Sequence, residues 1–226
     1  MSSYEIVRAG NSNSFPVEHA FTQQAIPNSA GLVLIGDSAG AAFSKAGNLE
    51  SRSFVAIELG NECLGVHTGE ARGQEGSNVV GFARFRMGTA DPSNLIELVK
   101  QPQTSASAVA AAKVAFEAAG FKVAVCNDFP GRIVNRLVRP YLNAALRRLD
   151  EKLASADDMD KTLCLGLGYP EGPISLLERT GLAEHFDVTA DLHAALGQEA
   201  YAPARRAQVA KQRSEQAAPA ALKRVA

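Results

Sequence analysis

Residues 128–145 read DFPGRIVNRLVRPYLNAA, and at this stretch the sequence changes character. From Asp128 onward apolar residues recur at helical spacing, as a stripe made of Val134, Val138, Tyr141, Leu142, Ala145 and Leu149. The opposite, polar face is expected to carry Arg132, Arg136, Arg139, Asn143 and Arg147. Asp128 and Pro130 are typical of a helix start, and Pro140 inside the pattern predicts a bend. The stretch therefore predicts that an all-helical part begins here.

Upstream of this stretch, short apolar runs bordered by glycines or turn residues indicate buried strands. They cover residues 31–38, 53–60, 78–85, 94–100 and 121–128. The alanine-rich segment 104–120 predicts a helix that Thr104 or Ser105 caps and Gly120 ends. Strands that alternate with a helix indicate an α/β sheet. We expect residues 1–30 to be irregular and the glycine-rich stretch 60–78 to be a loop.

Downstream, the loop 164–173 reads CLGLGYPEGP and lies between two helical patterns. Gly166 is expected to end one helix and Pro173 to start the next, while Gly168 and Gly172 allow unusual φ values. Ser155 is expected to cap the helix that precedes this loop, with Asp157 and Asp158 at its positive end.

Three segments follow from these patterns. Residues 1–127 are expected to form an α/β domain and residues 128–202 a helical domain. Residues 203–226 are rich in alanine and charge, with little apolar stripe, and are expected to form a flexible tail.

Composition narrows the class of protein. The chain has 226 residues and a formal net charge of −1, which gives no sign of a nucleic-acid or membrane partner. It holds no apolar run of about 18 residues and no signal-peptide core at its start, so we expect a cytoplasmic protein. Cys63, Cys126 and Cys164 fit neither a disulfide framework nor a zinc site. The four histidines also fit no metal-ligand spacing, and no metal site is expected: His19, His67, His185 and His193.

Residues 128–145 and 166–182, followed by YAP at 201–203, closely resemble the C-terminal domain of 3-hydroxyacyl-CoA dehydrogenases, including 3-hydroxybutyryl-CoA dehydrogenases. That family joins an NAD-binding Rossmann domain to a helical domain, which commonly forms the dimer and helps to enclose the acyl-CoA. The loop matches the family's GxGYPxGP connection. The resemblance thus implies a role in fatty acid metabolism, a homodimer formed through the helical domain, and an acyl-CoA-type ligand. It extends more weakly upstream, over residues 79–105 and 121–131 and to the strands at 31–38 and 53–65, so that the resemblance covers about residues 31–203.

The cofactor loop of the family has no counterpart. Family members open with a strand, a G-x-G-x-x-G turn and a helix that holds the pyrophosphate. Here GDSAG at 36–40 follows a strand, but its spacing is that of an ordinary glycine-rich turn. The polar residues before Leu32 leave no room for the first βαβ half. We therefore expect a truncated Rossmann-like sheet followed by the helical domain, and no cofactor bound with affinity, although NAD is the family's cofactor.

The catalytic set is also incomplete. The family uses a histidine as general base, a glutamate that orients it, and a serine and an asparagine that assist. Matching residues 81–85 with the family's GxHxF places Ala83 at the histidine position. The glutamate corresponds to Glu97 and the asparagine to Asn135, and Cys63 lies near the place of the serine. A solvent-facing carboxylate and a structural amide remain the alternatives for Glu97 and Asn135.

Two functions are compatible with these patterns. The first is a divergent or catalytically impaired relative that binds an acyl-CoA-type ligand as a dimer. The alternative is an active oxidoreductase on 3-hydroxyacyl-CoA, with NAD bound through a partner subunit or an unrecognised site. Arg84 and Arg86 flank Ala83 and are expected in surface ion pairs rather than on a phosphate.

Overall fold

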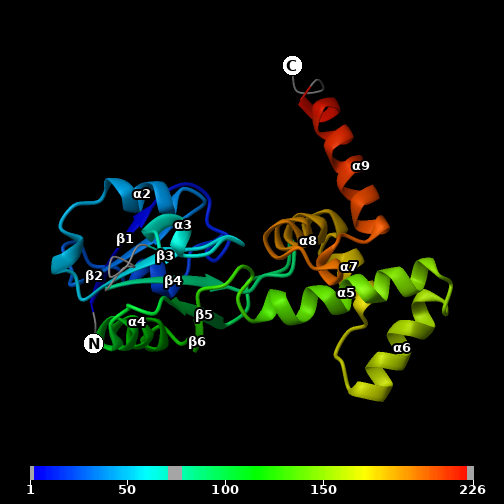
Figure 1. Ribbon diagram of the computed structural model, residues 1–226, viewed down its shortest axis with the longest axis horizontal. Coiled ribbons are helices and arrows are strands. Elements are labelled where there is room, and N and C mark those ends of the chain that lie inside the picture. The colour runs from blue at the N-terminus through cyan, green and yellow to red at the C-terminus, as the bar shows by residue number, and fades with distance from the viewer. Residues whose placement is uncertain (1–2, 71–77, 223–226) are drawn as a thin grey trace. The chain divides into compact units, whose positions relative to one another are not determined.

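The structure is a computed structural model that describes residues 3–70 and 78–222. The chain divides into two compact units (Figure 1). The α/β unit comprises Met1–Arg86 and Asp91–Ile133, and the helical unit comprises Met87–Ala90 and Val134–Ala226. Parts of the predicted loop 60–78 and of the predicted tail 203–226 lie outside the described residues.

The α/β unit contains a six-stranded sheet whose strands lie side by side in chain order. All neighbouring strands are parallel except β4 and β5, which are antiparallel. The strands are β1 (Tyr4–Arg8), β2 (Gly31–Ile35), β3 (Phe54–Glu58), β4 (Val79–Arg84), β5 (Leu95–Lys100) and β6 (Lys122–Asn127). The sheet, followed by helices, confirms the predicted fold class, a truncated Rossmann-like sheet and then an all-helical part.

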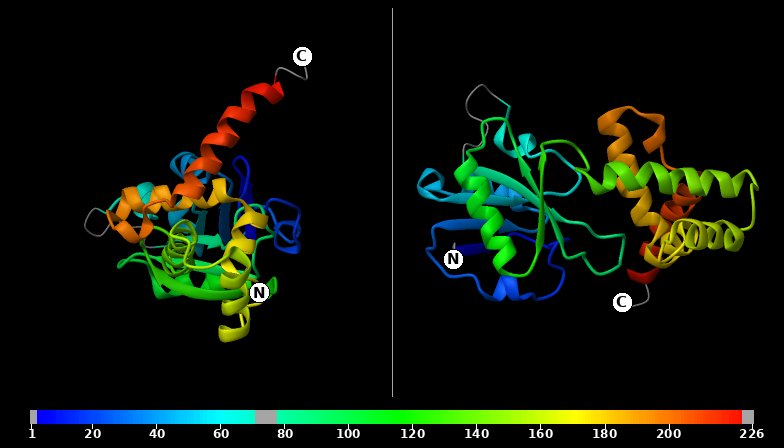
Figure 2. Two further views of the ribbon diagram at one scale, coloured as in Figure 1. Left: turned by 90° about the vertical axis from the view of Figure 1, so that its right-hand side faces the viewer. Right: turned by 90° about the horizontal axis from the view of Figure 1, so that it is seen from below.

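Helices cover both faces of this sheet. Helices α2 (Ala39–Lys45) and α3 (Gly65–Thr68) lie on one side and α4 (Ala106–Ala118) on the other (Figures 1 and 2). On the α4 side an aromatic cluster fills the core, made of Phe15, Phe21, Phe82, Phe116 and Phe121. Burial on both faces explains why the predicted strands are continuous apolar runs rather than alternating ones. Ser105 caps α4, as predicted.

The prediction of an irregular segment over residues 1–30 is wrong. Strand β1 pairs with β2 over five residues, and Ala20–Gln23 form the short helix α1, which His19 caps. Tyr4 begins β1, stacks on Phe21 and donates a hydrogen bond to its carbonyl oxygen. The segment looks polar because β1 lies at the edge of the sheet and only its first residue is buried.

The helical unit contains five α-helices in its described part. They are α5 (Val134–Asp150), α6 (Ala156–Leu167), α7 (Pro173–Thr180), α8 (Leu182–Leu196) and α9 (Arg205–Leu222). The last corrects the prediction of a tail from residue 203. Ala204 and Ala207 are buried, and Lys211 on α9 forms an ion pair with Asp187 on α8. The short side chains of alanines therefore anchor a helix in which no broad apolar stripe is visible.

Helix α5 begins later than predicted. Asp128 does not cap it, because the Asp128 carboxylate accepts hydrogen bonds from the backbone N–H groups of Leu64 and Gly65, at 2.7 and 2.8 Å. The predicted polar face of α5 is also wrong in part. Arg139 and Asn143 are 1% and 0% exposed, and both bond to the ring of His185 on α8 rather than to solvent.

The loop 164–173 joins α6 to α7 in a way that the sequence predicts only partly. Helix α6 passes through Gly166 and ends at Gly168, whose φ is +71°. Gly172 has an ordinary φ of −73°, but a Cβ atom there would lie 2.2 Å from the Cβ of Asp160. Pro173 begins α7, as predicted. The Asp160 carboxylate on α6 caps α7 by accepting a hydrogen bond from the N–H of Ile174 at 2.9 Å. This contact links α6 directly to the start of α7.

Candidate functional site

Ala83 and Glu97 lie directly opposite each other on the antiparallel strands β4 and β5. Side chains of such a pair share one face of the sheet, with Cβ atoms about 4.5–5.5 Å apart. The position matched to the family's histidine is thus the cross-strand neighbour of the position matched to its glutamate. Glu97 is 1% exposed, so the alternative of a solvent-facing carboxylate is wrong.

The Glu97 carboxylate is held by the segment that follows β6. Its Oε1 accepts a hydrogen bond from the N–H of Ile133 at 2.8 Å, and its Oε2 lies 3.4 Å from Nε of Arg132. The two paired side chains are 5% and 2% exposed. Arg132 has a φ of +54°, a left-handed conformation that is uncommon for a residue with a side chain. A buried cation therefore stands beside Glu97, while Ala83 offers no proton acceptor.

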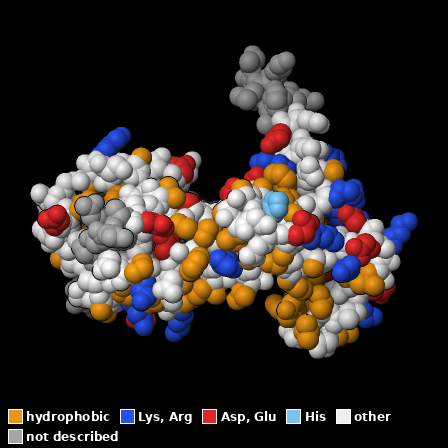
Figure 3. All heavy atoms as spheres, in the orientation of Figure 1, with side chains coloured by type: hydrophobic (Ala, Val, Ile, Leu, Met, Phe, Trp, Pro, Cys, Tyr) orange, Lys and Arg blue, Asp and Glu red, His pale blue; other side chains and the backbone are white. Residues whose placement is uncertain are grey.

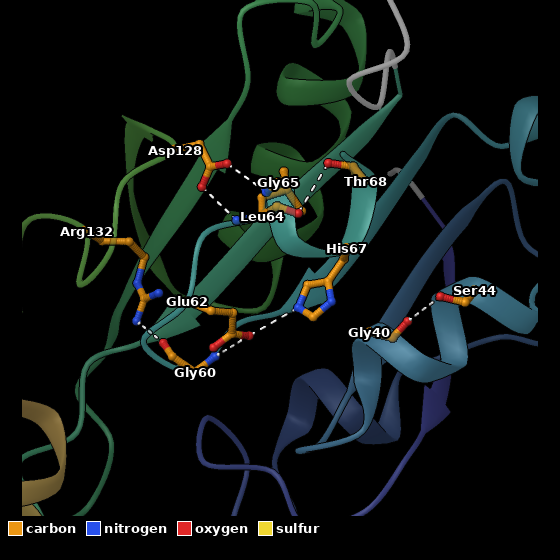
Figure 4. Close-up of polar contacts among 10 residues, drawn as sticks. All are labelled: Gly40, Ser44, Gly60, Glu62, Leu64, Gly65, His67, Thr68, Asp128 and Arg132. Atoms are coloured by element: carbon orange, nitrogen blue, oxygen red, sulfur yellow. Dashed lines mark hydrogen bonds and ion pairs between the residues drawn. The ribbon is translucent and has the colours of Figure 1, made fainter. Parts of the chain in front are cut away.

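Arg132 makes one further contact, a hydrogen bond from its Nη2 to the carbonyl oxygen of Gly60 at 2.7 Å (Figure 4). Its Nη1 is buried without a hydrogen-bond partner among the described residues. The pairing of Arg132 with Glu97 could not be read from the sequence, in which 34 other positions separate the two residues on different elements.

Cys63 lies in the α/β unit, in the turn that follows β3. Burial, together with the Asp128 carboxylate, raises the pKa of the Cys63 thiol to about 11. Burial and the neighbouring Glu97 likewise raise the pKa of Cys126 to about 11. Both side chains are therefore neutral thiols near pH 7, unsuited to act as nucleophiles or bases.

A histidine–carboxylate pair between this turn and α3 was missed by sequence reasoning. Nε2 of His67 lies 3.2 Å from Oε1 of Glu62, and that oxygen also accepts from the N–H of Gly60 at 3.1 Å (Figure 4). The ring of His67 packs against Gly40 on α2, where a Cβ atom would lie 2.1 Å from Nδ1. The spacing of Glu62 and His67 in the sequence gives no signal of this pair, because it depends on the fold of the turn.

A cavity of about 210 Å³ lies at the carboxyl ends of β1, β2 and β3, the edge at which α/β sheets usually bind ligands. Its lining residues are Asn11, Asn13, Gly36, Asp37, Gly40, Glu58, Leu59, Gly60, Glu62 and His67. Both carboxylate oxygens of Glu58 already accept hydrogen bonds within the protein, from the hydroxyl of Ser12 and the N–H groups of Ser14 and Gly36. Among the described residues, this lining holds acids and no lysine or arginine, which does not suit a phosphate. The stretch 36–40 forms a turn and the start of α2.

Arg84 corrects the expectation of a surface ion pair. Its guanidinium group donates to the backbone carbonyls of Ser14, Pro92 and Ser93 and lies 5.0 Å from the ring centroid of Phe121. Arg84 therefore closes the aromatic core. Nη1 of Arg86 lies 3.4 Å from Oδ1 of Asn13.

Asn135 belongs to the helical unit and is 8% exposed. Its Oδ1 accepts a hydrogen bond from Nε of Arg139 at 3.0 Å, and Nη1 of Arg139 lies 2.9 Å from Nδ1 of His185. Burial, helped by Arg139, lowers the pKa of His185 to about 3, so this histidine is neutral. The structure thus brings Ala83 and Glu97 together in one unit and sets Asn135 in a polar network of the other.

Residues 131–221 match the profile of the 3-hydroxyacyl-CoA dehydrogenase C-terminal domain. The helical part of the chain is thus similar to the C-terminal domain of 3-hydroxyacyl-CoA dehydrogenases. The human mitochondrial hydroxyacyl-coenzyme A dehydrogenase is 42% identical over 88 residues, which are 39% of this chain and 28% of that protein. The probable 3-hydroxybutyryl-CoA dehydrogenase of Deinococcus radiodurans is 33% identical over 109 residues, 48% of this chain and 39% of that one. The matches thus span well under half of these relatives.

Solved structures of other proteins support the same fold. The (S)-3-hydroxybutyryl-CoA dehydrogenase of Ralstonia eutropha matches 80% of this chain and 64% of its own, with 21% identity and a TM-score of 0.66. The 3-hydroxybutyryl-CoA dehydrogenase of Escherichia coli matches 80% of this chain and 39% of its own, with 23% identity and a TM-score of 0.68. At these identities the likeness concerns the fold alone.

In residues 3–70 and 78–222, no group of three or more histidine, cysteine or acidic side chains could hold a metal ion. Within the same ranges, none of the helices combines the length and apolar character that crossing a membrane requires.

Proposed function

We propose that this chain is a 3-hydroxyacyl-CoA dehydrogenase-like protein that binds an acyl-CoA-type ligand as a homodimer and has lost the dehydrogenation step. The observation that carries the proposal is the cross-strand pair. Ala83 stands where the family resemblance expects the general base, and the Glu97 opposite it is bound to Arg132. A positioned base contributes about 10²–10⁴-fold to such a reaction, and an alanine contributes no proton transfer.

The strand order supports weak or absent NAD(H) binding. Dinucleotides bind Rossmann folds in the crevice where the strand order reverses, against a glycine-rich turn at a helix N-terminus. The described strands run in chain order with no reversal, and the cavity at their carboxyl ends is lined by Asp37 and Glu62. Neither feature fits an anionic pyrophosphate. A millimolar or weaker dissociation constant for NADH is therefore expected.

The surface of the helical unit supports the homodimer. Hydrophobic side chains gather over α6 and the loop that follows it (Figure 3). There Leu165, Leu167 and Tyr169 are 77%, 64% and 40% exposed. Exposed apolar patches of this kind mark interaction sites, and a small helical unit buries little core alone. Light scattering after size exclusion should give a dimer, and Leu165→Glu should weaken it. Val114→Glu, at a half-exposed valine on α4 of the α/β unit, is the matched control.

Calorimetry with acetoacetyl-CoA and with NADH tests the function directly. Binding of the acyl-CoA alone supports the proposal. Micromolar binding of both, with NADH formation from 3-hydroxybutyryl-CoA and NAD, would instead support an active oxidoreductase. No binding of acetoacetyl-CoA at millimolar concentration would refute the ligand class.

A further inference from the structure

A histidine–glutamate pair borders the cavity at the carboxyl ends of β1, β2 and β3. Nε2 of His67 lies 3.2 Å from Oε1 of Glu62, and both residues line the cavity. Their side chains are 19% and 35% exposed, so neither is sealed inside the fold. Histidines held by a carboxylate serve in acid–base chemistry and ligand binding, and the proposed function makes no use of this pair.

The surroundings of His67 fix the position of its ring. The Asp128 carboxylate holds the start of α3 through two backbone N–H groups. At the end of this helix the Thr68 hydroxyl donates to Oε1 of Gln101 at 2.8 Å. The ring lies against α2 at Gly40 (Figure 4), where a Cβ atom would stand 2.1 Å from Nδ1. A larger residue at position 40 would therefore displace the imidazole.

The Glu62 carboxylate also decides which ring nitrogen of His67 can accept a hydrogen bond. An ionised carboxylate has no proton to donate, so in the neutral ring the proton is on Nε2 and the lone pair is on Nδ1. Within the described residues, Nδ1 of His67 has no hydrogen-bond partner, and Oε2 of Glu62 has none either. Two acceptors that the protein leaves unused thus belong to side chains that line one cavity.

The charge and size of the cavity narrow the kind of ligand that it fits. Asp37, which is exposed, and Glu58, which is buried, add negative charge to the lining, whereas Arg8 and Arg86 line a different cleft. This balance favours a positively charged ligand that donates hydrogen bonds. The described residues hold no group that could bind a metal ion, which favours an organic cation. At about 210 Å³, the cavity is smaller than a drug-sized site of about 300–1,000 Å³, so the ligand is small.

We propose that this cavity binds a small organic molecule through a primary ammonium group, which donates to Nδ1 of His67 and to the carboxylates of Asp37 and Glu62. An ammonium group has three N–H donors and no acceptor, which matches the three acceptors. Hydrogen bonds between ionised partners are also roughly twice as strong as neutral ones. A dinucleotide or an acyl-CoA, whose phosphates are anionic, is not the ligand of this cavity.

Ethylammonium chloride is the probe, with tetramethylammonium chloride as its control. Both are small cations, but tetramethylammonium has no N–H to donate. In isotope-labelled protein, the nitrogen chemical shifts of the His67 ring should show the form protonated on Nε2, and ethylammonium should shift the Nδ1 signal in a saturable way. A dissociation constant of about 1–10 mM is expected, since a ligand of so few atoms binds no tighter. Tetramethylammonium should bind about fivefold more weakly or worse, because it forms none of the hydrogen bonds.

Two substitutions that remove charge test the carboxylates. Asp37→Asn and Glu62→Gln each keep an oxygen acceptor and lose the negative charge. Each should weaken ethylammonium binding about fivefold or more, because a charge-assisted hydrogen bond becomes a neutral one. Glu117→Gln on α4 is the matched control, since Glu117 pairs with Lys113 on the surface of the same unit, and it should leave the affinity unchanged.

A matched pair of glycine substitutions tests the position of His67 without altering the histidine. Gly40→Ala should displace the ring and weaken ethylammonium binding about fivefold or more, although alanine favours the helical conformation of α2. A Cβ atom at Gly47, just after α2, would meet no atom within 4 Å, so Gly47→Ala should bind as the wild type does. The thermal midpoint shows whether each variant folds. If Gly40→Ala does not fold, His67→Leu removes the same acceptor and should give the same loss.

Several results would overturn this ammonium site. They are the absence of a saturable shift at His67, equal affinities for ethylammonium and tetramethylammonium, and unchanged ethylammonium binding in Asp37→Asn, Glu62→Gln and Gly40→Ala. A saturable shift of the His67 ring caused by sodium acetate, and not by ethylammonium, would assign the cavity to an anion instead. Acetoacetyl-CoA takes no part in these measurements, so the ammonium site and the proposed acyl-CoA function can each fail without the other.

Discussion

Arg132→Met should destabilise the α/β unit strongly, because it removes the cation that pairs with the buried Glu97 carboxylate. In the native protein the two charges are 3.4 Å apart, which corresponds to about 5 kcal/mol of attraction at an effective dielectric constant of about 20. Without Arg132, Glu97 keeps the hydrogen bond from Ile133 but remains almost fully buried. Breaking a buried pair in this way typically costs about 3–5 kcal/mol.

Removing both charges should cost less than removing one. The buried Nη1 of Arg132 has no hydrogen-bond partner among the described residues. The native ion pair therefore does not fully offset the cost of removing the guanidinium group from water. Glu97→Gln combined with Arg132→Met leaves no buried charge and keeps an acceptor for Ile133. We expect the double variant to be more stable than either single one, with a coupling energy of at least about 2 kcal/mol.

Urea unfolding followed by circular dichroism measures these free energies. Hydrogen exchange in β5 reports on the α/β unit separately, since a chain of two units need not unfold in one step. Lys113→Met is the matched control, because Lys113 pairs with Glu117 on the surface of the same unit and should change stability by at most about 1 kcal/mol. A cost below about 1 kcal/mol for Arg132→Met, with additive free energies in the double variant, would refute the reasoning.

Three further predictions concern the loop, the buried histidine and the chemistry. Gly172→Ala should lower the thermal midpoint because its Cβ would collide with Asp160, whereas Gly166→Ala, in an open position of α6, should leave it unchanged or raise it. The folded pKa of His185, about 3, lies below its ordinary value, so the unfolded chain binds more protons between about pH 3 and 6.5. The free energy of unfolding should therefore decrease as the pH is lowered through that window, by about 2 kcal/mol at pH 5 relative to neutrality. His185→Gln should flatten this pH dependence in urea titrations. Finally, neither the wild type nor Ala83→His should form NADH from 3-hydroxybutyryl-CoA and NAD, since the base and the cofactor site are needed together; turnover by the wild type would refute the match of Ala83 with the base.

Strands β2 to β6 and the capping residues Ser105 and Ser155 could be predicted because their signals are local. A strand buried on both faces is a continuous apolar run, and Ser105 and Ser155 bond to backbone groups within the next turn. Strand β1 was not predicted because an edge strand pairs through its backbone, which leaves its side chains free to be polar. Helix α9 was not predicted because alanines produce little apolar stripe even where they are buried.

The buried polar residues could not be predicted, for a different reason. A helical wheel shows that Arg139 and Asn143 are polar, but the side chain that satisfies both is His185, which lies on another helix. Their burial is favourable only once that helix has docked. The same holds for Asp160, whose bond to the start of α7 makes a cap from a neighbouring helix.

The pairing of Arg132 with Glu97 follows from the sheet rather than from the site. Phe82 and Leu98 are cross-strand partners that face the aromatic core, and their burial sets the register of β4 and β5. Ala83 and Glu97 therefore stay opposite each other whatever residue occupies position 83. With alanine there, the buried carboxylate of Glu97 has no imidazole beside it and still requires a compensating group. Arg132, which has a left-handed conformation just before α5, supplies this compensating charge. The segment that resembles a helix start therefore serves to neutralise Glu97, which has no histidine opposite it.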